Sequence, residues 1–185
     1  MLTISEKATI FSQFISLKGS DKWVIVELNT TEHLHRSHSK RLKYLDIPIQ
    51  YVALNVSLQV NFNYYLKLSE LQFSIIGDSV IFNVPDLYLV TPVAFESSTF
   101  NLDCHSSLFS SCEEINTQLM SELSDELEYI GKEKIPSIYD IAAKSLAENF
   151  DHFANTIKPK IKYKTIVVEF QKEDGSCLRQ FSYRL

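Results

Sequence analysis

A run of strictly alternating residues constrains the fold of this chain more than any other feature. Between residues 54 and 64, apolar side chains alternate with uncharged polar ones. The apolar members are Leu54, Val56, Leu58, Val60, Phe62 and Tyr64, and the polar members are Asn55, Ser57, Gln59, Asn61 and Asn63. Because a strand directs successive side chains to opposite faces, the run predicts a long half-buried strand that begins after Pro48. Plain solvent exposure is the default interpretation of this polar row, and a partner-binding surface is the alternative, because amides and a hydroxyl stand where lysine, glutamate or threonine is usual.

Shorter patterns predict the remaining strands. KWVIVEL, from Lys22 to Leu28, is a β-branched run between polar residues. LQFSII and SVIFNV are joined by Gly77 and Asp78, which predicts a type II′ hairpin, because glycine takes a positive φ at no steric cost. VAFESSTF follows Pro92 as another extended piece, and KYKTIVVEFQ with SCLRQFSYRL predicts a C-terminal hairpin.

Three segments have helical periodicity. Residues 5 to 17 carry apolar side chains at helical spacing, and Gly19 would end that helix. Ser111 and Glu114 have the form of a capping box, and the apolar spacing that follows predicts a helix up to Gly131. Ser137 opens a further apolar stripe that runs to residue 157, before Pro159. The sequence therefore predicts two long helices in its second half.

Composition excludes several function classes. The 185 residues have a net charge of −5 and a pI near 5.5, so the chain lacks the broad basic surface of nucleic-acid binders. Its four glycines lie far apart, whereas phosphate and dinucleotide loops need clustered glycines. No apolar run reaches the roughly 18 residues of a membrane span, and no secretory signal is evident at the start. The composition is typical of a soluble globular chain.

Three cysteines, Cys104, Cys112 and Cys177, are odd in number and lack C-x-x-C spacing, which favours a reducing compartment. A disulfide between Cys104 and Cys112 remains open. Asp103, Cys104 and His105 also place a carboxylate, a thiol and an imidazole in a row. Cysteine catalysis is one hypothesis for this triplet, although neighbours in sequence seldom attain the required geometry.

Two stretches, NFNYYLKLSELQFSIIGDSVIFNVPDLYLVTP and AAKSLAENFDHFANTIKPKIKYKTIVVEF, resemble a bacterial family known as a domain of unknown function, numbered four-two-three-zero. The resemblance covers about residues 50–100 and 140–170. The chain departs from the family in lacking the "G-I-D-L" element and an N-terminal membrane segment. The resemblance implies a fold and a possible peripheral envelope association, and it implies no reaction.

The segment TEHLHRSH places His33, His35 and His38 within six positions. On a helix His35 and His38 can share a face, and on a strand His33 and His35 share one, so neither geometry gathers all three. A metal site is one hypothesis, and a solvated polar connection is the other. Because nearby cations repel a dication, an anion or phospholipid headgroup bound by Arg36, Lys40, Arg41 and Lys43 is a further hypothesis for this window, with ordinary solvated charge as the default interpretation.

An acidic stretch from Glu113 to Glu128 contains no lysine or arginine. Most of its carboxylates fall opposite the apolar stripe, which predicts a solvated acidic face that can also dock on a basic partner. Lys160, Lys162 and Lys164 alternate along the chain and are one candidate for such a surface.

We expect one α+β domain over residues 1–185, with a mainly antiparallel sheet, two long helices packed on one face and a C-terminal hairpin. The expected function is a non-catalytic interaction domain that binds a protein partner or a second copy. The alternatives are a metal-binding protein or small hydrolase using the three histidines, and anion binding at the basic segment. We expect no cofactor and no nucleic-acid partner. A cytoplasmic location is expected, or membrane association if the resemblance holds.

Overall fold

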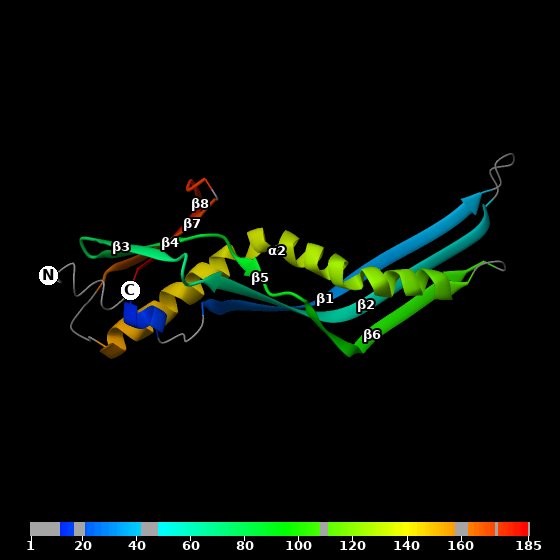
Figure 1. Cartoon of the computed structure of the whole chain (residues 1–185), viewed down its shortest axis with the longest axis horizontal. Coiled ribbons are helices and arrows are strands. Elements are labelled where there is room, and N and C mark those ends of the chain that lie inside the picture. The colour runs from blue at the N-terminus through cyan, green and yellow to red at the C-terminus, as the bar shows by residue number, and fades with distance from the viewer. Residues whose placement is uncertain are drawn as a thin grey trace. The chain divides into compact units, whose positions relative to one another are not determined.

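The computed structural model describes residues 12–16, 21–41, 48–107, 111–157, 163–172 and 174–184, with only the backbone of residues 40, 41, 48, 49 and 157. Residues 12–16 are helical. The other elements, shown in Figure 1, are β1 (Lys22–Arg41), β2 (Pro48–Lys67), β3 (Gln72–Ile76), β4 (Ser79–Val84), β5 (Tyr88–Leu89), β6 (Ala94–Ser106), α2 (Cys112–Ile157), β7 (Thr165–Gln171) and β8 (Cys177–Arg184).

The chain divides into two compact units. Unit 1 consists of Met1–Glu27, Asn63–Leu89 and Lys134–Leu185, and unit 2 consists of Leu28–Phe62 and Val90–Glu133. Three elements, β1, β2 and α2, contribute residues to both units. The expectation of one domain over residues 1–185 stays a prediction.

Unit 1 contains a four-stranded sheet with the order β3-β4-β7-β8. The hairpin predicted around Gly77 is confirmed, since β3 and β4 pair antiparallel and Gly77 has a φ of 61°. The C-terminal hairpin is also present, as β7 pairs antiparallel with β8. β4 and β7, in contrast, run parallel, with Ser79 beside Thr165. Parallel neighbours need a long crossover connection, and α2 lies in the chain between them.

The core of unit 1 forms where the sheet meets the second half of α2. Alternate residues of β4 and β7 are buried, including Phe82 and Phe170. The ring of Phe150, on α2, lies edge-on to that of Phe82, with centroids 4.9 Å apart. Tyr139, also on α2 and buried, donates a hydrogen bond from its hydroxyl to Asp86 Oδ1 at 2.6 Å. Burying these aromatic rings stabilises the unit.

Unit 2 is a sheet with a helix on one face. β2 lies between β1 and β6, and it pairs antiparallel with β6 in a register that sets Val52 opposite Ser106 and Asn61 opposite Ala94. The predicted apolar face of β2 is confirmed, because Leu54, Val56, Leu58, Val60 and Phe62 are at most 2% exposed. Leu119, Leu123 and Leu127 of α2 are buried in the same unit, and Figure 1 shows this part of α2 running along the sheet.

The prediction of two long helices is wrong, because residues 112–157 form one helix. The sequence placed a break between Gly131 and Pro136. Gly131 lies four residues after Leu127, on the same buried side of the helix. A glycine inside a helix costs about 1 kcal/mol of stability relative to alanine, and the packing at this position offsets that cost. Pro136 lies inside the helix, and its carbonyl accepts a hydrogen bond from Arg179 Nη1 at 2.8 Å.

Two further expectations are corrected. The fold is α+β with mostly antiparallel pairing, but the β3-β4-β7-β8 sheet is mixed because β4 and β7 run parallel. The strand expected to end at Leu28 continues to Arg41, so the histidine segment is part of β1 rather than a connection. Tertiary pairing with β2 extends the strand beyond what local composition indicates.

Candidate functional site

The candidate site is the side of the β1-β2-β6 sheet that faces away from α2. Alternation along each strand and the register between β2 and β6 define its members. We call this surface the open polar face. It consists of Asn29, Thr31, His33, His35 and Ser37 of β1, Tyr51, Ala53, Asn55, Ser57, Gln59 and Asn61 of β2, and Ala94, Glu96, Asn101, Asp103 and His105 of β6.

A hydrogen bond connects polar side chains of two strands across the open polar face. His35 Nδ1 and Asn55 Oδ1 lie 2.7 Å apart and join β1 to β2. Asn55 in turn lies opposite Asp103 on β6, and Ser57 lies opposite Asn101. Polar side chains of β2 and β6 therefore stand opposite each other, and the contact between His35 and Asn55 links β1 to them.

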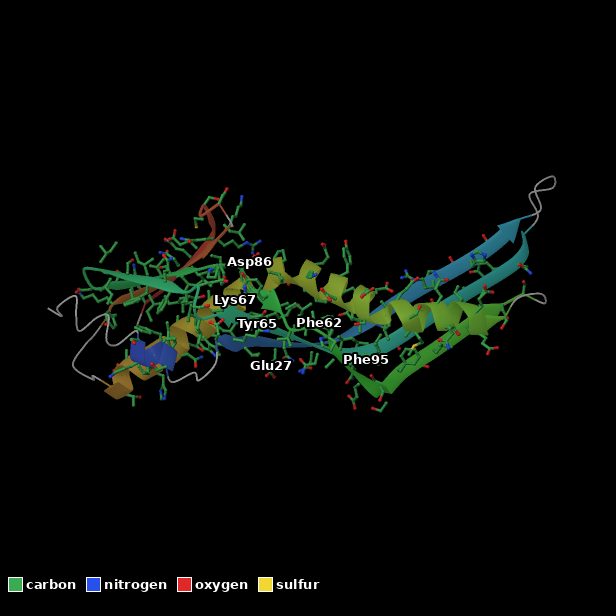
Figure 2. All side chains as sticks on the ribbon, in the orientation of Figure 1. Glu27, Phe62, Tyr65, Lys67, Asp86 and Phe95 are labelled. Atoms are coloured by element: carbon green, nitrogen blue, oxygen red, sulfur yellow. A yellow bond between two sulfur atoms is a disulfide. The ribbon has the colours of Figure 1, made fainter. Side chains whose placement is uncertain are left out.

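A bulge in β6 shapes the middle of the face. Ser57 of β2 pairs with Asn101 of β6, and the next pair along the strands is Gln59 with Glu96. β6 therefore has more residues than β2 between these two pairs. Thr99 Oγ1 stabilises the extra residues, since it accepts a hydrogen bond from Gln59 N at 2.8 Å and donates one to Glu96 O at 2.7 Å. β6 bends near Phe95, which Figure 2 labels and which comes shortly before the residues that the bulge adds. Such bulges redirect side chains at sheet edges.

Two hollows lie along the open polar face. One, of about 450 Å³, is lined by residues 29–31 of β1, 59–61 of β2 and 94–96 of β6. The other, of about 360 Å³, lies among residues 33–35, 55–57, 101 and 103. Each hollow therefore crosses all three strands. Asn61 Oδ1, at the first hollow, is buried and has no hydrogen-bond partner among the described residues.

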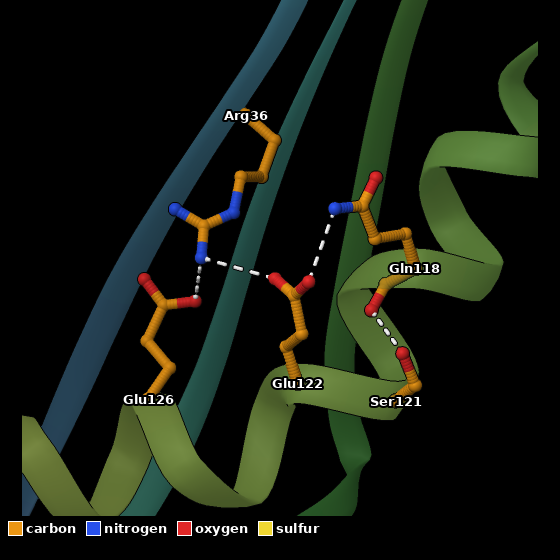
Figure 3. A network of polar contacts seen from close by, with 5 residues as sticks. All are labelled: Arg36, Gln118, Ser121, Glu122 and Glu126. Carbon is orange, nitrogen blue, oxygen red and sulfur yellow. Dashed lines mark hydrogen bonds and ion pairs between the residues drawn. The ribbon is translucent and has the colours of Figure 1, made fainter.

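The opposite side of the same sheet is covered by α2 and is linked to it by an ion-pair network (Figure 3). Arg36 extends from β1, and its Nη2 lies 2.8 Å from Glu126 and 3.7 Å from Glu122. Gln118 Nε2 donates a hydrogen bond to Glu122 at 3.0 Å. The acidic stretch was expected to be a solvated face, and part of it instead binds a cation of β1. Sequence reasoning missed this pairing, because Arg36 and Glu126 are ninety residues apart.

The three histidines are separated in the way a strand requires. His33 and His35 lie on the open polar face, while His38 lines a cavity of about 370 Å³ on the covered side, together with Arg36 and Glu114. Within the part of the chain that the structure describes, no group of three or more His, Cys, Asp or Glu side chains is arranged to hold a metal ion. The metal-site alternative therefore has no support from the geometry of these histidines.

Of the predicted anion-binding residues, the structure places one side chain. Arg36 is engaged by two carboxylates, as described above, while the side chains of Lys40 and Arg41 and the whole of Lys43 lie outside the described residues. Lys160 and Lys162 also lie outside them. The anion-binding hypothesis stays a prediction.

The polar row of β2 is placed as expected over most of its length. Asn55 and Gln59 are exposed, and Ser57 and Asn61 are half-buried. Asn63 belongs to unit 1 rather than unit 2, and its Oδ1 is buried without a hydrogen-bond partner among the described residues. The open polar face therefore includes the first four members of the row.

A disulfide closes one end of unit 2. Cys104, on β6, is bonded to Cys112, the first residue of α2. Cys104 has no free thiol, so the cysteine-catalysis hypothesis is wrong for this residue. His105 Nε2 lies 3.2 Å from Asp103, and both side chains are exposed. The disulfide disagrees with the reducing compartment that the cysteine pattern favoured.

No family model, no curated protein and no solved structure matches the chain. The likeness to the domain of unknown function therefore stays a prediction. Among the described residues, no helix combines the length and apolar character that a bilayer crossing requires. The fold and the candidate site define an α+β protein in which one face of a sheet is covered by a helix and the other face is polar.

Proposed function

We propose that the protein is a non-catalytic binding protein and that the open polar face is the docking surface for its partner. The observation that carries the proposal is the contrast between the two sides of one sheet. One side is covered by α2 and is apolar, and the other presents ordered amide, hydroxyl and imidazole groups from three strands. Charged residues such as lysine and glutamate often cover exposed strand faces.

The arrangement of the polar groups supports binding rather than catalysis. Catalytic groups converge on one reacting atom, usually in an enclosed cleft. Here the side chains are spread along regular strands, and the two hollows are open. Such a surface makes many weak contacts with an extended partner. A protein or a second copy of the chain is the partner expected from the sequence.

The disulfide supports an oxidising compartment for this function. Disulfides persist in secreted, periplasmic and cell-surface proteins and are rare in the cytosol. We therefore propose an extracytoplasmic location in place of the cytoplasmic one. This location is compatible with a peripheral association with the cell envelope.

Photo-crosslinking from selected positions tests the docking surface. In a Cys177→Ser background, benzophenone is attached to Ser57→Cys on the open polar face and, as a matched control, to Ser124→Cys on the exposed side of α2. Each labelled protein is then irradiated in an extract of its native cells. The proposal predicts discrete adducts from Ser57→Cys that are absent from Ser124→Cys. Equal labelling from both positions, or no adduct from Ser57→Cys, would contradict it.

A further inference from the structure

The chemistry of the open polar face narrows the class of partner, provided that the face is the docking surface proposed above. We infer that it binds a neutral, hydroxyl-rich glycan chain. Three observations carry the inference: the kinds of hydrogen-bonding groups present, the charges on the face, and the arrangement of the two hollows.

The hydrogen-bonding groups match sugar hydroxyls. A hydroxyl both donates and accepts, and so does the side-chain amide of asparagine or glutamine. Five amides lie on the face, those of Asn29, Asn55, Gln59, Asn61 and Asn101. The hydroxyls of Thr31, Ser37 and Ser57 add groups of the same kind. A partner with a dense array of hydroxyls is therefore complementary to the face over its whole length.

Charge argues against a polyanion. The described side chains of the open polar face include no lysine or arginine, whereas Glu96 and Asp103 each contribute a carboxylate. Phosphate or sulfate groups would be repelled by these two carboxylates and would find no ammonium or guanidinium group to bind. These charges therefore disfavour nucleic acids and sulfated glycans as partners. A neutral glycan carries no charge that the two carboxylates would repel.

The face has little of the large apolar surface that anchors protein interfaces, which favours a glycan over the protein partner expected from the sequence. Stable protein interfaces are anchored by buried aromatic and large aliphatic side chains at their centre. The aliphatic residues of this face are Ala53 and Ala94, which are small. Two large aromatic rings border the face: Tyr51, at the end of the polar row, is 46% exposed, and Phe95, which lines the first hollow, is 38% exposed. An exposed tyrosine ring offers a flat apolar platform with a polar edge, which suits the apolar face of a sugar ring.

The two hollows lie in line along the strands. Their midpoints on β2 differ by about four residues, which corresponds to about 13 Å at the rise of a β-strand. Two hollows at this separation fit successive parts of one extended chain better than a single small molecule. Asn61 lines the first hollow, and its buried Oδ1 has no hydrogen-bond partner among the described residues, so a ligand hydroxyl can engage this amide after the side chain rotates.

Affinity gel electrophoresis with defined polysaccharides tests the inference. The native gels contain laminarin, dextran, mannan or soluble chitin oligomers, with heparin as the anionic comparison. The expected result is retardation by at least one neutral glycan and none by heparin. Asn55→Ala with Asn101→Ala removes two amides and should weaken the retardation about tenfold or more, given about 1 kcal/mol for each hydrogen bond. Tyr51→Ala, which tests the stacking platform separately, should weaken it as well.

The matched control is Asn149→Ala, which removes an exposed amide from the second half of α2 in unit 1 and should leave the retardation unchanged. Thermal melting of each variant verifies folding, since the substituted side chains are exposed. Retardation by heparin alone, by none of the glycans, or to the same degree in every variant would overturn the inference. If Ser57→Cys still gives selective adducts with a protein, the docking surface stands and only the glycan assignment fails. If neither experiment identifies the face, both proposals fail.

Discussion

Removing the disulfide should destabilise unit 2 by a predictable amount. Cys104 and Cys112 close a short loop, with a sequence separation of 8. The chain-entropy relation for a loop of this size gives about 2.5 kcal/mol of stabilisation at room temperature, because the bond restricts the unfolded chain. The double variant Cys104→Ser with Cys112→Ser should therefore lower the free energy of unfolding of unit 2 by about 2.5 kcal/mol.

Native-state hydrogen exchange locates the loss. The amides of Leu119 and Leu123, on the half of α2 in unit 2, should exchange about 50-fold to 100-fold faster in the double variant, which corresponds to about 2.5 kcal/mol. The amide of Val168, in β7 of unit 1, is the internal control and should change little. Unchanged exchange at the two leucines, or equal acceleration at Val168, would refute the reasoning that the bond stabilises unit 2 locally.

Three further substitutions have defined outcomes. Arg36→Met should lower the free energy of unfolding, measured in urea, by about 1 kcal/mol or less, because the ion pairs of Arg36 are partly exposed. Replacing Glu126 by Gln in the same variant should restore part of that free energy. A loss near 4 kcal/mol would contradict this prediction. Burial, and then the hydrogen bond to Asp86, raise the pKa of Tyr139, so the folded state keeps a proton that the unfolded chain loses above about pH 10. The free energy of unfolding should therefore fall as the pH rises beyond that value. Between about pH 9 and pH 11 the melting temperature should fall less for Tyr139→Phe than for the wild type. An equal fall of the melting temperature in both proteins would exclude Tyr139 as a cause. Gly77→Ala should lower stability by about 1 kcal/mol, because alanine is strained at the positive φ of the hairpin turn, and an unchanged melting temperature would count against that conformation.

Local patterns predicted those elements whose stability comes from nearby residues. The alternation along β2 predicted which face is buried, and the glycine turn at Gly77 predicted the hairpin. Both signals depend on side-chain direction or on φ at a single position, which the sequence displays directly. The polar row of β2 was found in the same way, since it is the other half of the alternating pattern.

Long-range packing decided what the sequence did not show. A glycine at position 131 and a proline at position 136 are usual signs of a helix end, yet α2 continues through both. The histidine segment extends β1 because β2 lies beside it, which no local signal indicates. Arg36 and the acidic stretch were both identified as charged features, but the distance between them along the chain concealed their pairing. The contributions of β1 and β6 to the open polar face also depended on strand order, which the sequence could not give.

Hydroxyl-radical footprinting tests the central claim most directly, because it reports which exposed side chains a partner covers. The purified protein and the same protein in an extract of its native cells are labelled side by side and analysed by mass spectrometry. The account predicts reduced labelling of His33, His35 and Tyr51 in the extract, while Tyr129 on α2, which is 65% exposed, keeps its labelling. Unchanged labelling of the three open-face residues, or protection confined to Tyr129, would contradict the claim that the open polar face is where the partner binds.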